Sequence, residues 1–123
     1  MKGGSGGDAS GGSGANLALR TEDLTVWVME RAEKFPRNHK YTVGDKLVET
    51  CLEMTTLVVE ANYLPSQSRA KLVRLQAAAR AVTQAGVLIR VAQRLGLLSA
   101  RQRGHFAQQS EALGRMLGRR IAS

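Results

Sequence analysis

A helical repeat of apolar residues runs through most of the chain and is interrupted at only three places. From Thr21 onward, apolar residues recur at helical spacing, with no alternating strand pattern and no Asn-Gly hairpin signal. Pro36, Pro65 and Gly96 end successive segments, because proline cannot continue a helix and glycine favours its C-terminal end. The pattern predicts helices over residues 22–35, 43–63, 67–95 and 100–121. Four helices joined by short turns favour an all-α fold, an up-down antiparallel four-helix bundle.

Two short polar patterns predict where helices begin. Thr42 with Asp45, and Ser99 with Gln102, have the three-residue spacing of a capping box. Gly44 lies between Thr42 and Asp45 and would allow another segment to approach the first turn of this helix closely. The apolar faces expected to meet in the core are Leu24, Val28, Ala32 and Phe35; Leu47, Cys51, Met54 and Val58; and Phe106, Leu113 and Leu117.

The N-terminal tract differs in composition from the rest of the chain. Residues 2–15 read KGGSGGDASGGSGA, which is typical of a flexible linker or a fusion scar. We therefore expect residues 1–20 to be a flexible tail and residues 21–123 to form one four-helix bundle domain.

The third predicted helix has large apolar residues around most of its circumference. A helix on the outside of a monomeric bundle is expected to be apolar on one face only. Burial on two sides, against its own bundle and against another subunit, would explain the pattern. The sequence therefore favours a homo-oligomer.

Several classes of function fit the sequence poorly. No Gly-rich phosphate loop lies between a strand and a helix, and no Glu-x-x-His pair of the kind found in di-metal bundles occurs. Cys51 is the single cysteine and falls on an apolar stripe, and Glu49 with Glu53 is more typical of a solvated face than of a metal site. We expect no enzyme activity, no metal and no cofactor. Without a membrane span or signal-peptide core, the expected setting is cytoplasmic.

Charge is distributed unevenly along the chain, whose formal net charge is +8. Residues 1–60 have a net charge of −2, whereas residues 61–123 have +10 with Glu111 as their single acid. Such one-sided basicity indicates an anionic partner, an acidic protein surface or a solvated basic face. Because the later basic residues are almost all arginine and aromatics are scarce, the pattern favours binding to a nucleic-acid backbone over base stacking.

The candidate binding residues lie in three segments of the sequence, which are the connection after Pro36, the third predicted helix and the last predicted helix. Arg101, Arg115 and Arg119 share one face of the last predicted helix, while some arginines of the third helix could instead pair with glutamates across a subunit interface. The full set of candidates for binding nucleic acid or a protein partner is Arg37, Lys40, Arg69, Arg74, Arg80, Arg90, Arg94, Arg101, Arg115, Arg119 and Arg120.

Four motifs resemble those of a known family, in the expected order. They are EKFPRNHKYTVGDKL (residues 33–47), VVEANY (58–63), LGLLSARQ (95–102) and GRMLGRR (114–120). Together they resemble the accessory variability determinant (Avd) proteins of diversity-generating retroelements. These are similar to the four-helix bundle proteins encoded within intervening sequences of ribosomal RNA genes.

The resemblance implies more than the residues alone can show. It implies a homopentameric barrel with a positively charged surface, which binds the element's reverse transcriptase and template-region RNA. The complex would make the mutated complementary DNA used in mutagenic retrohoming. The accessory protein itself would not be catalytic. The implied partners are further copies of the chain, the reverse transcriptase, template-region RNA and, as a further candidate, complementary DNA, with no membrane partner.

Two alternatives stay open at this point. The chain could be an RNA-binding or structural bundle of the ribosomal-RNA intervening-sequence type, with no reverse transcriptase partner. A bundle enzyme is the other, and it would require a bound metal.

Overall fold

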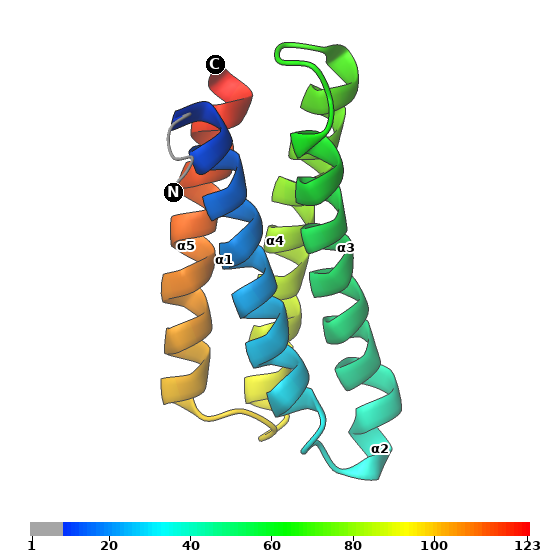
Figure 1. The fold of residues 1–123 in the computed structure, drawn as a ribbon. Helices are drawn as coiled ribbons and strands as arrows, with labels where there is room; N and C mark the ends of the chain where they lie inside the picture. The colour runs from blue at the N-terminus through cyan, green and yellow to red at the C-terminus, as the bar shows by residue number, and fades with distance from the viewer. Residues whose placement is uncertain (1–8) are drawn as a thin grey trace, which may run out of the picture.

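The computed structural model describes residues 9–123, which fold into a bundle of four long helices without any β-strand in that range. The long helices are α1 (Ala9–Ala32), α3 (Asp45–Asn62), α4 (Arg69–Arg94) and α5 (Ala100–Ala122). They run alternately up and down, and each packs on its neighbour in the order α1, α3, α4, α5, with α5 closing against α1 (Figure 1). The expected all-α four-helix bundle is therefore confirmed.

The core is built from the apolar stripes that the helical spacing predicted. Val28, Met54 and Leu117 are at most 1% exposed, and Phe106 is 2% exposed. Small residues of α4 complete the core where the helices approach closely, because Ala78, Ala81, Ala85 and Ala92 all face inward. Close packing of these side chains provides the hydrophobic stabilisation of the bundle.

The first helix begins well before the expected residue 22. Leu17 and Thr21 are completely buried, because they continue the stripe of Leu24 and Val28 by one more heptad. At the same end, the side-chain amide of Asn62 donates a hydrogen bond of 3.0 Å to the carbonyl of Gly14. The assignment of residues 9–20 to a flexible tail is thus wrong, because α1 starts at Ala9 and is packed against the bundle from Gly14 onward. Residues 1–8 of the expected tail lie outside the described residues.

The buried start of α1 predicts that substitutions at two nearby leucines differ in their effect on the free energy of unfolding. Leu17→Ala should lower the free energy of unfolding by about 2 kcal/mol, as expected for a large-to-small change in a core. Leu19→Ala should change it by less than about 0.5 kcal/mol, because Leu19 is 55% exposed. Urea unfolding followed by circular dichroism measures both. Equal effects would show that α1 does not pack from residue 17.

The connection between α1 and α3 is more helical than expected. Pro36 precedes a single turn, α2 (Arg37–His39), which continues as the π-helical turn η1 (Lys40–Gly44) into α3. Thr42 is therefore not an N-cap; its hydroxyl donates to the carbonyl of His39 at 3.3 Å. The expected helix start at residue 43 is wrong, because the chain is already helical there.

Phe35 and Gly44 lie next to each other at the connection between α1 and α3. Phe35 lies beyond the end of α1 but is only 6% exposed. Gly44 is buried beneath it, and a Cβ built on this glycine would lie 3.4 Å from Cδ2 of Phe35. The expected close approach at Gly44 is confirmed.

The ends of α4 and α5 follow standard capping chemistry. The Ser68 hydroxyl accepts the Lys71 amide at 3.1 Å, and α4 starts two residues after the expected position because Gln67 has a φ of +61°. Gly96, with a φ of +78°, ends α4 as expected. Ser99 and Gln102 form the predicted capping box, with bonds of 2.9 and 3.0 Å.

Candidate nucleic-acid interface

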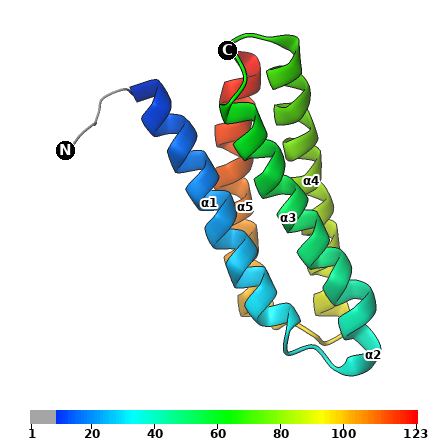
Figure 2. The ribbon, with the colours of Figure 1, turned by 45° about the vertical axis from the view of Figure 1, so that its right-hand side comes forward.

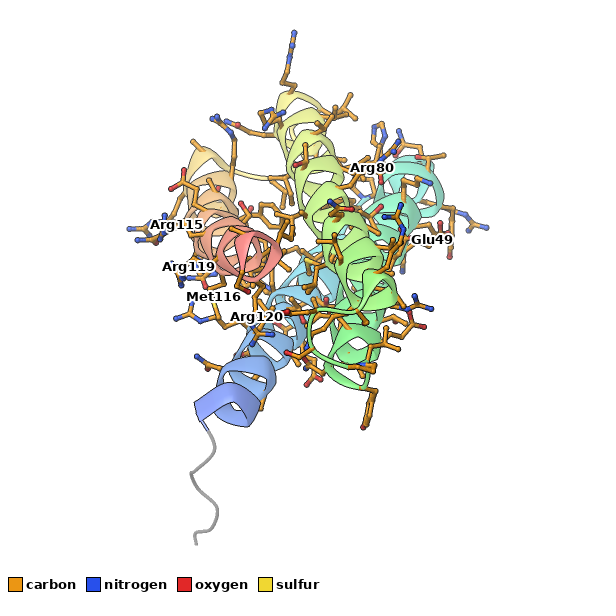
Figure 3. The ribbon with its side chains drawn as sticks, turned by 90° about the horizontal axis from the view of Figure 1, so that it is seen from above. Glu49, Arg80, Arg115, Met116, Arg119 and Arg120 are labelled. Carbon is orange, nitrogen blue, oxygen red and sulfur yellow. The ribbon has the colours of Figure 1, made fainter. Side chains whose placement is uncertain are left out.

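The outer face of α5 carries the strongest group of candidate residues. Arg101, Arg115 and Arg119 are exposed on the side of α5 opposite its buried residues. Figure 3 shows Arg115 and Arg119 extending from α5 away from the other helices. No carboxylate among the described residues lies within ion-pair distance of these three guanidinium groups. This face can therefore neutralise an anionic partner without breaking an existing ion pair.

Arg120 differs from the three arginines before it. It is half-buried and turns toward α1, where its Nη2 would lie 3.6 Å from a Cβ built on Gly14. Arg120 also has an interaction of its own within the chain. Its place is therefore at the contact between α5 and α1, apart from the open face.

A second basic cluster arises where two connections meet at one end of the bundle. The turn between α4 and α5 lies at the same end as the connection between α1 and α3 (Figure 1). Residues about 55 positions apart in the sequence thus share one end of the molecule. This end cluster contains Arg37, Lys40, Arg90, Arg94, Arg101 and Arg103.

Sequence reasoning missed Arg103 as a member of this cluster. It lies in the first turn of α5 and is exposed. The helical-face argument omitted it, because Arg103 does not share the face of Arg101. Its proximity to the α4–α5 turn was the available signal.

The arginines of α4 do not form one continuous surface. Arg74 pairs with Glu60 of α3 at 3.4 Å, so the pairing expected across a subunit interface occurs here within one chain. Arg69 lies at the first turn of α4, Arg90 and Arg94 at its opposite end, and Arg80 in between. The structure therefore divides the candidates of α4 among three locations.

Arg80 lies among exposed apolar side chains, which we name the valine stripe. Val73, Val87, Val91 and Leu95 form this stripe; they are 39–48% exposed and fall within one narrow arc of α4. The opposite face of α4 is buried in the core of the chain. Two buried faces were expected for this helix. One of them is buried within the chain, and the other, the valine stripe, is exposed in the single chain.

A groove of about 450 Å³ lies between α1 and α3. Its apolar lining includes Val48 and two exposed residues, Val26 and Met29, which are 54% and 44% exposed. The charged residues that line this α1–α3 groove are Glu30, Glu33, Lys40 and Asp45, which makes it acidic overall.

Trp27 joins α1 to α5 through a stack that the sequence did not predict. Its ring centroid lies 4.9 Å from that of His105, and the guanidinium carbon of Arg31 lies 4.8 Å from the same ring. Phe106 contacts Trp27 from the core side, at 6.5 Å between centroids. The stack therefore engages His105 of α5.

The groups considered for catalysis or metal binding are not assembled into a site. Burial raises the pKa of the Cys51 thiol to about 12, so the group stays protonated at neutral pH. Within residues 9–123, no three metal-ligating side chains come together. No helix in this range is long and apolar enough to cross a membrane.

Comparison with protein families identifies a family for this chain. The family model described as bAvd-like matches residues 17–123, and this range begins at the buried Leu17 of α1. No curated protein and no solved structure shows a significant match to the chain.

Proposed function

The chain belongs to the bAvd-like family, and on this premise we propose that it is a non-catalytic accessory protein of a diversity-generating retroelement. In this role it would act in the cytoplasm and bind the element's reverse transcriptase and template-region RNA. It would thereby support mutagenic synthesis of complementary DNA. The chemical step belongs to the polymerase, and no metal or cofactor is assigned to the accessory protein.

The single observation that supports RNA binding best is the α5 face. Three exposed arginines, Arg101, Arg115 and Arg119, project from one rigid helix without a carboxylate partner among the described residues. Each guanidinium group can donate two parallel hydrogen bonds to phosphate oxygens. A flat face of this kind suits an RNA backbone, because it neutralises phosphates without reading bases.

The end cluster would extend this binding surface. Arg101 belongs to both groups, so it links the α5 face to the cluster at the end of the bundle. An RNA strand could therefore follow α5 and continue onto Arg37 and Lys40 of the α1–α3 connection.

Assembly into a homo-oligomeric barrel is also part of the proposal. The valine stripe contains one cation, Arg80, and one amide, Gln84, among its apolar side chains, whereas the α1–α3 groove combines apolar lining residues with three acids and one lysine. The stripe of one copy would therefore fit the groove of the next, with Arg80 facing acids. Such a head-to-tail contact between two different surfaces generates a ring when its rotation closes, as in a pentamer.

Salt dependence tests the RNA-binding part of this proposal. Each phosphate neutralised in single-stranded RNA contributes about −0.7 to the slope of log K against log salt concentration. The three α5 arginines of one chain should therefore give a slope of about −2 or steeper. Fluorescence anisotropy with a labelled RNA from about 50 to 300 mM KCl measures it. A slope near zero would contradict binding through phosphates.

A further inference from the structure

A cavity of about 830 Å³ opens at the end of the bundle opposite the end cluster. All four long helices contribute to its lining, including Gly14 of α1 and Asn62 of α3. The first turns of α1 diverge from the other helices at this end (Figure 2). The volume lies within the range of sites that bind small molecules, roughly 300–1,000 Å³.

The lining of this end cavity is basic on its walls. Arg69 and Lys71 come from the first turn of α4, and Arg120 comes from the last turns of α5. None of the described residues that line the cavity has an acidic side chain. Arg69 and Lys71 take part in no ion pair with the described residues. The α-carboxylate of Ser123 also lines the cavity, but Arg69, Lys71 and Arg120 outnumber it, so the lining is positive overall and favours an anionic ligand.

The rest of the lining indicates what the anion would be attached to. Leu72, Leu75 and Ile121 provide apolar surface, while Ser66 and Gln67 provide a hydroxyl and an amide at the turn before α4. Apolar surface beside hydrogen-bonding groups suits a ribose and base that carry a charged group.

The backbone of α4 adds weaker support. Ser68 accepts the amides of Lys71 and Leu72 at 3.1 Å each, which satisfies the later amides of the first turn. The amides of Arg69 and Ala70 precede them at the positive end of a 26-residue helix. This end of α4 favours negative charge in the same place as the side chains do.

We propose that the end cavity binds the terminal phosphate monoester of a nucleotide. A monoester has a charge of about −1.5 to −2 at neutral pH, more than the single charge of a backbone diester, and so gains more from clustered cations. A concave site at the end of the bundle also suits a chain terminus, whereas a backbone strand suits the open α5 face. The inference that the nucleotide is part of an RNA rests on the proposed function. The inference that the cavity binds an anion is independent of the proposed function.

Two probes distinguish a free nucleotide from an RNA end. They are adenosine 5′-monophosphate alone, and a pair of RNA decamers that differ only in a 5′-phosphate or a 5′-hydroxyl. The phosphorylated RNA should bind about tenfold more tightly than the hydroxyl form, a factor typical of one added charge-assisted contact. Isothermal titration calorimetry on the complete chain measures each affinity.

Two double variants separate the end cavity from the α5 face. In the Arg69→Gln, Lys71→Gln variant, the preference for the 5′-phosphate should vanish while the hydroxyl RNA still binds. In the matched Arg115→Gln, Arg119→Gln variant, both RNAs should bind more weakly and the tenfold preference should remain. All four positions lie outside the buried core, so circular dichroism should show folded chains.

Each result decides the proposal. Binding of the monophosphate alone, lost in the Arg69→Gln, Lys71→Gln variant, supports the cavity as a site for a free nucleotide even if neither RNA binds and the proposed function fails. A 5′-phosphate preference without binding of the monophosphate places an RNA end there. Equal affinity for both RNAs together with no binding of the monophosphate overturns the proposal, whatever the outcome for the α5 face.

Discussion

A chain with Arg101→Glu, Arg115→Glu and Arg119→Glu should lose RNA affinity by about a hundredfold or more at roughly 150 mM salt. The three reversals remove the phosphate contacts of the α5 face and place repelling carboxylates there. The slope of log K against log salt should become shallower by about 2, because three fewer counterions are released. Anisotropy titrations at several salt concentrations measure both effects, and pull-down with the reverse transcriptase measures the second proposed contact.

A matched variant separates position from total charge. Arg20→Glu, Lys34→Glu and Lys46→Glu also lowers the formal net charge from +8 to +2, but at exposed positions outside α5. This control should lose far less RNA affinity, and light scattering should give both variants the wild-type mass. If the α5 variant binds RNA as tightly as the control does, these arginines are not the binding surface.

The sequence predicted the interior of the bundle better than its ends. The stripes through Val28, Met54 and Leu117 follow directly from helical spacing, because burial of one face determines which residues are apolar. The start of α1 was missed because a Gly/Ser-rich composition outweighed one informative residue, Leu17. The Thr42 cap was mispredicted because a short polar pattern does not show whether the chain before it is already helical.

The sequence indicated most of the candidate arginines, but it did not indicate how they lie together in space. One-sided charge identified the arginines, and helical angles grouped Arg101, Arg115 and Arg119 correctly. The end cluster and the end cavity each combine segments that are far apart in the sequence. Only the antiparallel arrangement of the helices shows that Arg37 shares an end with Arg103, and that Arg69 shares the opposite one with Arg120.

Val87→Asp with Val91→Asp should convert the proposed homo-oligomer to monomers. The two side chains lie about one helical turn apart on the valine stripe and are 44% and 39% exposed in the single chain. Burying two carboxylates against the apolar side chains of the α1–α3 groove would remove both charges from water without a compensating partner, which opposes the contact. Because both positions are exposed in the chain itself, thermal unfolding should change little. Light scattering measures the mass, and circular dichroism checks the fold.

A second variant tests whether the stripe and the groove contact each other. Val26→Asp with Met29→Asp places the carboxylates in the groove instead, and this chain should also be monomeric. Mixing the two variants should restore one contact only, since the stripe variant has an intact groove and the groove variant an intact stripe. The mixture should therefore form a one-to-one heterodimer that cannot grow, because each remaining surface is blocked. With a stripe-to-stripe contact, the groove variant would remain assembled on its own, because its stripe is intact, and this result would disprove the head-to-tail arrangement.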